Sequence, residues 1–203
     1  MLIDLFSSSA LAGTNGTWID ATTGGLWSSS ANWSGGTIAD GTDGIADFST
    51  LNIAADNTVH LDTARTIGTL KFGDTTPSNN WTLDNNGNSP NILTMAVSSG
   101  SPLIQVNNQT ATISAILAGS QGLTTVGNAT GDAVLTLAGA NSYSGGTTIA
   151  NAARIVANAS TTQSGGVITS GPLGTGVVTI GPANLMLGTS SGLTLANPIV
   201  VSD

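Results

Sequence analysis

Three aspartates close together in the sequence are the first candidates for chemistry. Asp40, Asp43 and Asp47 form the acidic cluster of this chain. Carboxylates in such a group can bind calcium, or act as general acid and base on a polysaccharide. Solenoid enzymes that cleave acidic sugars normally add Lys, Arg or His, and those are nearly missing here. Loop solubility is therefore the favoured interpretation, with a low-affinity calcium site as the alternative and no other cofactor expected.

Two further motifs look catalytic at first sight. His60 is the one histidine, in an alternating run that places it opposite Val59 and Leu61, so we expect a solvated strand position. The run 188–192 matches the Gly-x-Ser-x-Gly pattern of serine hydrolases. That nucleophile needs a later histidine, and none follows it. Neither motif predicts an enzyme.

The third candidate group is aromatic. Trp18, Trp27 and Trp33 lie with Phe48 in a Gly- and Ser-rich start. Large rings can fill the open end of a coil, or, if exposed, can stack on sugars. We favour a cap, and keep a carbohydrate-binding module that uses these tryptophans as the alternative function.

The composition limits the partners. The chain has 203 residues, a net charge of −8, only 7% charged residues and three Lys plus Arg. Such a surface cannot neutralise phosphates, so nucleic-acid binding is excluded, and no apolar run approaches the length that spans a bilayer. The chain also lacks cysteine, which fits export through a bacterial envelope.

Short apolar clusters separated by turn residues indicate an all-β fold. Helix formers such as Glu and Lys are scarce, whereas Thr, Val, Gly and Asn are abundant. Clusters such as 67–72, 92–97, 134–137 and 167–168 recur through most of the chain, and they often alternate. We expect Leu135 and Leu137 to point inward and Thr136 outward.

This spacing alone also fits an antiparallel sandwich. The corners are longer than two-residue hairpin turns and contain Gly-Gly, Asn-Asn and Ser-Gly, which suits a chain that bends without reversing. We therefore predict a right-handed parallel β-solenoid (β-helix) of about 7 or 8 coils. Residues 1–50 would form an irregular Trp-rich N-terminal cap and residues 51–203 the solenoid coils.

One segment carries a specific sequence motif. Residues 132–150 run through Leu-Thr-Leu, a turn at Asn141, then Tyr143, Gly145-Gly146 and a second strand. This pattern closely resembles the autotransporter-associated β-strand repeat. Three other segments, 66–73, 171–180 and 196–201, resemble further parts of such passengers, as does the Trp-containing start.

The resemblance implies an extracellular β-solenoid on a bacterial cell surface, without catalytic activity. Members of the family usually carry a signal peptide and a carboxy-terminal membrane barrel, so we expect a passenger fragment or a standalone relative. The function expected from it is structural, as a stalk, fibre subunit or adhesin scaffold. A surface glycan remains a possible partner.

The last apolar strand suggests a site of assembly. Ile199, Val200 and Val201 follow Asn197-Pro198 with no aromatic residue near them. A strand edge left open there would pair with more chain or with another copy, which would give head-to-tail filaments.

Overall fold

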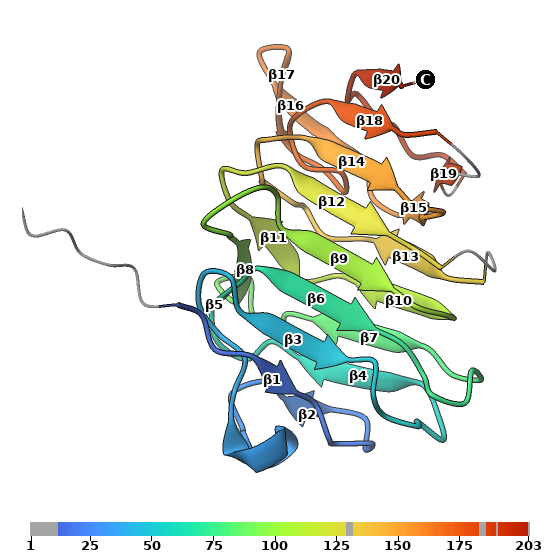
Figure 1. Ribbon diagram of the computed structural model, residues 1–203. Coiled ribbons are helices and arrows are strands. Elements are labelled where there is room, and N and C mark those ends of the chain that lie inside the picture. Colours follow the sequence, from blue (N-terminus) through green and yellow to red (C-terminus); the bar gives the residue numbers. More distant parts are fainter. Residues whose placement is uncertain (1–11, 129–131, 183–185, 190, 203) are drawn as a thin grey trace, which may run out of the picture.

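The chain winds as a single stack of β-coils (Figure 1). The structure is a computed structural model, and it describes residues 12–128, 132–182, 186–189 and 191–202. Two long parallel sheets form opposite sides of the stack, and a short third sheet closes one flank. The described residues contain no helix of the length and hydropathy needed to cross a bilayer.

The front sheet in Figure 1 has eight strands. In spatial order they are β1 (Gly16–Thr17), β3 (Ile45–Phe48), β6 (Thr69–Phe72), β9 (Leu103–Val106), β12 (Leu123–Val126), β14 (Thr147–Ala150), β18 (Val178–Ile180) and β20 (Ile199–Val201). Every neighbouring pair is parallel. Successive coils therefore lie about 4.8 Å apart.

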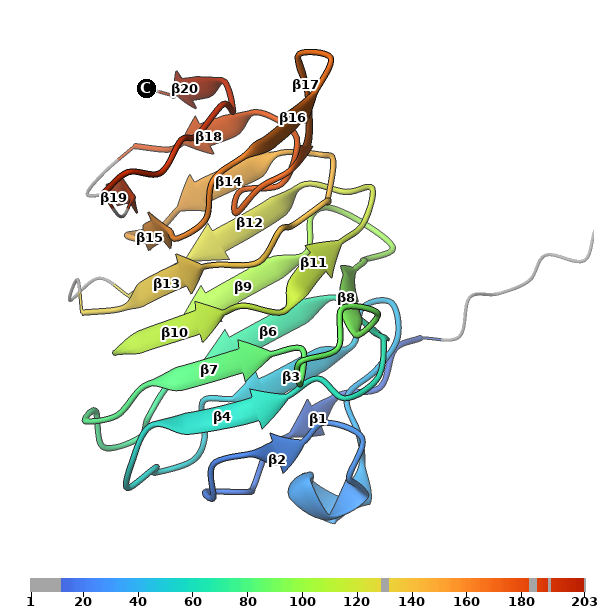
Figure 2. The ribbon, with the colours of Figure 1, turned by 180° about the vertical axis from the view of Figure 1, so that it is seen from behind.

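The opposite sheet, seen from behind in Figure 2, has seven strands. They are β2 (Gly25–Leu26), β4 (Asn57–His60), β7 (Trp81–Asp84), β10 (Thr110–Ile113), β13 (Val134–Leu137), β15 (Arg154–Ala157) and β19 (Met186–Thr189). The third sheet holds β5 (Arg65–Ile67), β8 (Ile92–Met95) and β11 (Ile116–Ala118). In Figure 1 the front strands run to the right and the back strands return to the left as the chain rises, so the winding is right-handed. The predicted right-handed parallel β-solenoid is confirmed.

Alternating side chains fill the interior in columns. Val59, Leu83, Ile113 and Leu137 stack in register on four successive strands and are fully buried. Burying such apolar surface is the main stabilising contribution to a stack of this kind. Leu135 is also buried, whereas the side chain between the two leucines, on Thr136, is only half-buried. The predicted inside and outside faces of β13 are therefore confirmed.

A column of hydroxyl groups follows the outside of the seven-stranded sheet. Thr58, Thr82, Thr112 and Thr136 are neighbours on consecutive strands. All four are half-buried, so each β-branched side chain packs against its neighbours while its hydroxyl is available to water.

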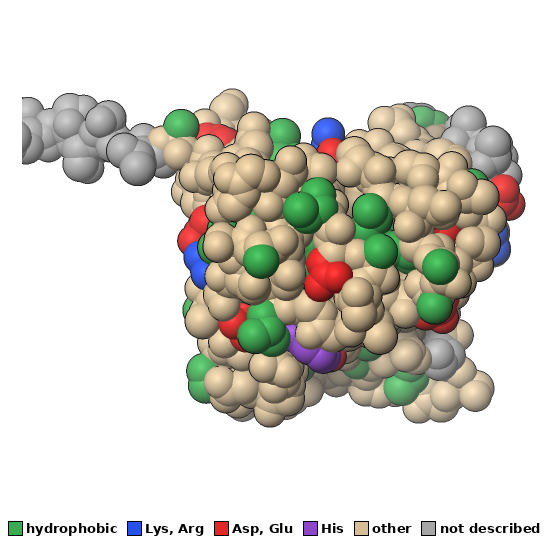
Figure 3. Space-filling view, turned by 90° about the horizontal axis from the view of Figure 1, so that it is seen from below, with side chains coloured by type: hydrophobic (Ala, Val, Ile, Leu, Met, Phe, Trp, Pro, Cys, Tyr) green, Lys and Arg blue, Asp and Glu red, His purple; other side chains and the backbone are tan. Residues whose placement is uncertain are grey.

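Aromatic rings fill the lower end of the stack. Two short 3-10 helices, η1 (Ser30–Asn32) and η2 (Ser34–Gly36), lie there next to β1 and β2. The rings of Trp18, Trp27 and Trp33 lie 5.6 to 5.7 Å from that of Phe48, and Phe48 stacks on Phe72 at 5.1 Å. Seen from below, the described surface is mostly polar with scattered hydrophobic side chains (Figure 3). The tryptophans thus close this end as expected, although β1, β2 and β3, all within residues 1–50, already belong to the two long sheets.

One element departs from the parallel pattern. β16 (Thr162–Ser164) and β17 (Val167–Ser170) form an antiparallel hairpin that projects from the upper part of the stack. Gly165 and Gly166 form its turn with φ of 58° and 80°, and Val167 is 67% exposed. The 167–168 cluster, which we expected among the coils, therefore lies outside them, because a Gly-Gly turn reverses the chain.

Candidate functional site

The recognisable repeat motif holds three coils together through one amide. Asn141 is fully buried. Its Oδ1 accepts a hydrogen bond from the Leu117 backbone N–H of the preceding coil at 2.8 Å, and its Nδ2 donates to the Pro172 carbonyl of the following coil at 2.8 Å. Buried backbone groups need hydrogen-bond partners, and the Asn141 side chain supplies them for one N–H and one carbonyl that are not paired within the sheets.

The motif tyrosine packs against the next coil. Tyr143 is fully buried, and its hydroxyl lies 2.7 Å from the Thr147 Oγ1, which donates to the Leu173 carbonyl at 3.0 Å. Burial raises the pKa of Tyr143. A Cβ on Gly174, where φ is 67°, would lie 2.6 Å from the tyrosine ring. Glycine is required there by both backbone conformation and space.

Glycines allow the same corner to stack closely from coil to coil. A Cβ on Gly145 would collide with the Gly122 backbone, and one on Gly176 would lie 2.6 Å from the Gly146 nitrogen. The Gly-Gly element of the motif is thus explained by close backbone approach. All of these residues support the stack, and none presents a reactive group to solvent.

A buried carboxylate organises the opposite corner, after β6. Asp74 is 1% exposed and accepts hydrogen bonds from the backbone N–H groups of Ile53, Thr76, Ser78 and Asn79. Burial would raise the pKa of Asp74, but these four N–H donors outweigh it and lower the pKa below its usual 3.8. The sequence analysis missed this residue. An isolated aspartate before a Thr-Thr-Pro-Ser turn is a common turn pattern that does not reveal burial.

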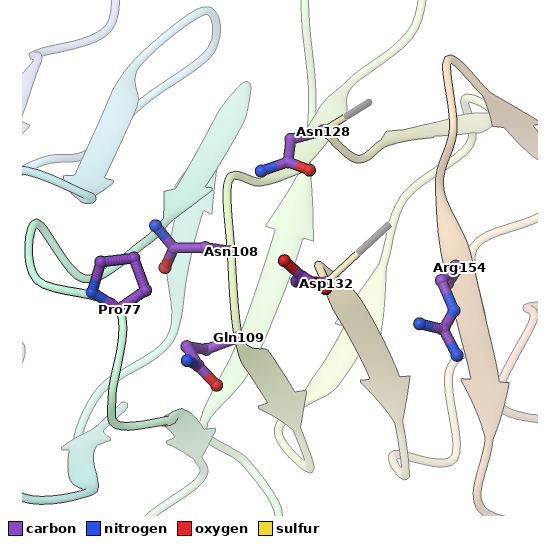
Figure 4. A pocket seen from close by; sticks show the side chains of 6 residues that line it. All are labelled: Pro77, Asn108, Gln109, Asn128, Asp132 and Arg154. Carbon is purple, nitrogen blue, oxygen red and sulfur yellow. The ribbon is translucent and has the colours of Figure 1, made fainter. Parts of the chain in front are cut away.

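An open groove lies at this same series of corners. It has a volume of about 670 Å³ and is lined by Pro77, Asn108, Gln109, Asn128, Asp132 and Arg154 (Figure 4). These residues come from four successive coils, at the corners where the chain passes from the eight-stranded to the seven-stranded sheet. Sequence reasoning did not find it, because its residues are spread over 78 positions and share no motif.

The tryptophans do not form a binding platform. Trp18 and Trp27 are 0% exposed and Trp33 is 1% exposed. Their indole N–H groups donate to the carbonyls of Asp20, Ala39 and Trp27 respectively. A sugar would have to open the core to stack on any of these rings, so the alternative of a carbohydrate site at Trp18, Trp27 and Trp33 is wrong.

The acidic residues are not assembled into one site. Asp40 pairs with Arg65 at 2.8 Å, Asp43 accepts from the Ser98 N–H, and Asp47 accepts from Ser49. Hydrogen bonds from Ser98 lower the pKa of Asp43. The described part of the chain contains no group of three or more His, Cys, Asp or Glu placed to hold a metal. The calcium candidates Asp40, Asp43 and Asp47 therefore serve separate local contacts.

The other two catalytic-looking motifs stay isolated. His60 lies on the outer face of β4, with its Nδ1 2.6 Å from the Asp84 Oδ1, while Val59 and Leu61 on either side are buried. Ser190 of the Gly-x-Ser-x-Gly match lies outside the described residues.

The proposed assembly edge lies at the upper end of the stack. β20 is the last strand of the eight-stranded sheet and pairs with β18. Ile199, Val200 and Val201 are 52%, 51% and 69% exposed. This row is an apolar strand with an open side in the described structure.

Comparison with known proteins shows a similarity to an autotransporter adhesin. The chain is 33% identical over 133 residues to the adhesin BmaC autotransporter of Brucella suis biovar 1 (strain 1330). The match covers 65% of this chain and 4% of that protein. No family model matches, and no solved structure matches. The similarity relates this chain to autotransporters. It agrees with the resemblance seen in residues 132–150 and with the β-solenoid.

Proposed function

We propose that this chain is a non-catalytic structural segment of a cell-surface, adhesin-like protein. The observation that carries the proposal is the continuous parallel stack, in which the motif residue Asn141 links consecutive coils. Such a stack extends in one direction and keeps whatever it carries at a fixed distance from its base. The similarity to an autotransporter adhesin supports a place on the cell surface.

The distribution of polar groups also supports a scaffold. The polar side chains of the corners and cap are mostly used in contacts within the chain, as Asp74 and Asn141 illustrate. His60 is engaged with Asp84, and the three aspartates of the acidic cluster have separate partners. Catalysis needs a nucleophile, a base and an orienting group within hydrogen-bond reach, whereas these groups are dispersed.

Surface labelling tests this proposal directly. Antibodies raised against the purified chain should bind intact cells of the organism that carries it, and protease treatment of intact cells should remove the signal. Antibodies to an internal protein serve as the control for cell integrity. Labelling that occurs only after lysis would refute the surface role.

We further propose that the exposed edge of β20 pairs with a second copy of the chain. The apolar, half-exposed row of Ile199, Val200 and Val201 supports this, because open strand edges add further strands readily. Light scattering should show particle size rising with protein concentration. Val201→Lys should suppress the rise, since a charge at an edge opposes pairing. A monomer at all concentrations would refute self-association and leave the structural role untouched.

A further inference from the structure

The corner groove has the dimensions of a ligand site. Its volume of about 670 Å³ falls within the range of about 300 to 1,000 Å³ that small-molecule sites occupy. It crosses four coils, and three strand spacings of about 4.8 Å make it roughly 14 Å long. Figure 4 shows Pro77 and Arg154 toward its two ends, with Asn108, Gln109 and Asp132 between them. A site of this length suits a short chain of linked units.

Two of the lining amides fix the walls of the groove. The Asn108 Oδ1 accepts from the Asp74 backbone N–H at 2.8 Å, and its Nδ2 donates to the Asp74 carbonyl at 3.0 Å. The Asn128 Nδ2 donates to the Asn107 carbonyl. These bonds connect each corner to the preceding one. The walls are therefore set before any ligand arrives, which lowers the entropy cost of binding.

Two other lining side chains remain available to a ligand. Gln109 is half-buried and Asp132 is exposed, and neither side chain hydrogen-bonds to another described residue. Gln109 also has a φ of 56°, a left-handed conformation that glycine adopts more easily. A side chain held in this conformation strains the backbone, and such strain is often found at functional positions.

The chemistry of the lining selects the ligand class. Typical small-molecule pockets are lined mainly by apolar side chains, whereas Pro77 is the one apolar side chain among the six here. Asp132 and Arg154 balance each other in charge, so the lining favours neither an anion nor a cation. None of the six described lining residues has an aromatic ring that could stack on a nucleobase. Amide, carboxylate and guanidinium groups together suit a ligand that carries many hydroxyls.

We propose that this groove binds a neutral oligosaccharide along the axis of the solenoid. Gln109 offers both a donor and an acceptor to sugar hydroxyls, Asp132 accepts from them, and Arg154 donates to them. Pro77 provides an apolar surface for the C–H face of a sugar ring. This inference adds a ligand to the structural role and does not depend on it.

Binding to a set of immobilised neutral and acidic oligosaccharides tests the proposal. The wild-type chain should retain one or more neutral oligosaccharides. Gln109→Gly and Asp132→Ala should each weaken the dissociation constant for that glycan about tenfold, the effect of losing roughly one good hydrogen-bonding group. Gln163→Ala, on the exposed β16 away from the groove lining, is the matched control and should bind like the wild type.

The glycine variant separates binding from folding. Because glycine adopts a φ of 56° without strain, Gln109→Gly should melt at or above the wild-type temperature while binding more weakly. The proposal is overturned if the wild type retains no neutral glycan or retains acidic glycans alone. It is equally overturned if both groove variants bind like the wild type. None of these binding results affects the surface-labelling experiment, so the glycan-binding proposal can be refuted without refuting the structural role, and the reverse also holds.

Discussion

Removal of the Asn141 amide should destabilise the stack strongly. In Asn141→Ala, the Leu117 N–H and the Pro172 carbonyl would both lose their partner in a fully buried site. Each unsatisfied buried group costs about 1 to 3 kcal/mol, so the free energy of unfolding should fall by about 2 to 6 kcal/mol. At about 2 to 4 °C per kcal/mol for a chain of this size, Tm should fall by roughly 4 to 24 °C.

Circular dichroism during heating and urea titration measures this loss. Asn85→Ala is the matched control: the Asn85 side chain is half-buried and makes no hydrogen bond with other described residues, so its loss should cost about 0.5 kcal/mol or less. Asn141→Asp keeps an acceptor for the Leu117 N–H but loses the donor to Pro172. Relative to the wild type at each pH, it should recover stability on acidification, because a protonated carboxyl can donate again.

The comparison has a clear refuting result. If Asn141→Ala and Asn85→Ala unfolded at the same temperature and urea concentration, the amide would not connect the coils energetically. If the loss of stability in Asn141→Asp relative to the wild type were the same at every pH, the assignment of the Asn141 Nδ2 as the donor to the Pro172 carbonyl would be contradicted.

Three further substitutions or conditions test other parts of the stack. Leu137→Asp puts an unpaired charge into an apolar column and should cost several kcal/mol, whereas Thr136→Asp on the outer face should cost about 1 kcal/mol or less; equal losses in thermal melts would contradict the face assignment. Folding lowers the pKa of Asp74, so the contribution of this carboxylate to stability is complete above about pH 4 and is lost as pH falls through the lowered pKa. In Asp74→Asn the free energy of unfolding, measured by tryptophan fluorescence, should therefore depend less steeply on pH in the acid range. Gly174→Ala would push its new methyl group against the Tyr143 ring, so it should lower Tm more than Gly165→Ala, where φ is similar but the space is open. Equal Tm values for the two variants would show that the tyrosine ring moves aside at no cost.

The stack could be predicted from sequence because its information is local and repeated. Alternation at 134–137 gives the faces of a strand, and the Asn-x-Tyr-x-Gly-Gly element is specific enough to identify its corner. The aromatic cap followed from Trp18, Trp27 and Trp33 lying together at one end of the chain. Both kinds of signal reflect burial, which the amino-acid pattern records directly.

The groove and the buried carboxylate could not be predicted in the same way. Their residues come together only after the coils have stacked, and neither the left-handed conformation of Gln109 nor the burial of Asp74 leaves a mark in the sequence. The β16–β17 hairpin was missed for a different reason. In sequence, its Gly165-Gly166 turn resembles the Gly-Gly bends between coils, although a two-residue glycine turn is also a hairpin signal.

The outer column of Thr58, Thr82, Thr112 and Thr136 has a consequence for the medium in which the molecule can work. Its hydroxyls are uncharged, and only 7% of the residues in the chain carry a charge. Dissolved ions screen interactions between exposed charges over a Debye length of about 10 Å at 0.1 M, but an uncharged hydroxyl has no such interaction to lose. The folded state should therefore tolerate wide changes in ionic strength, from fresh water to brine.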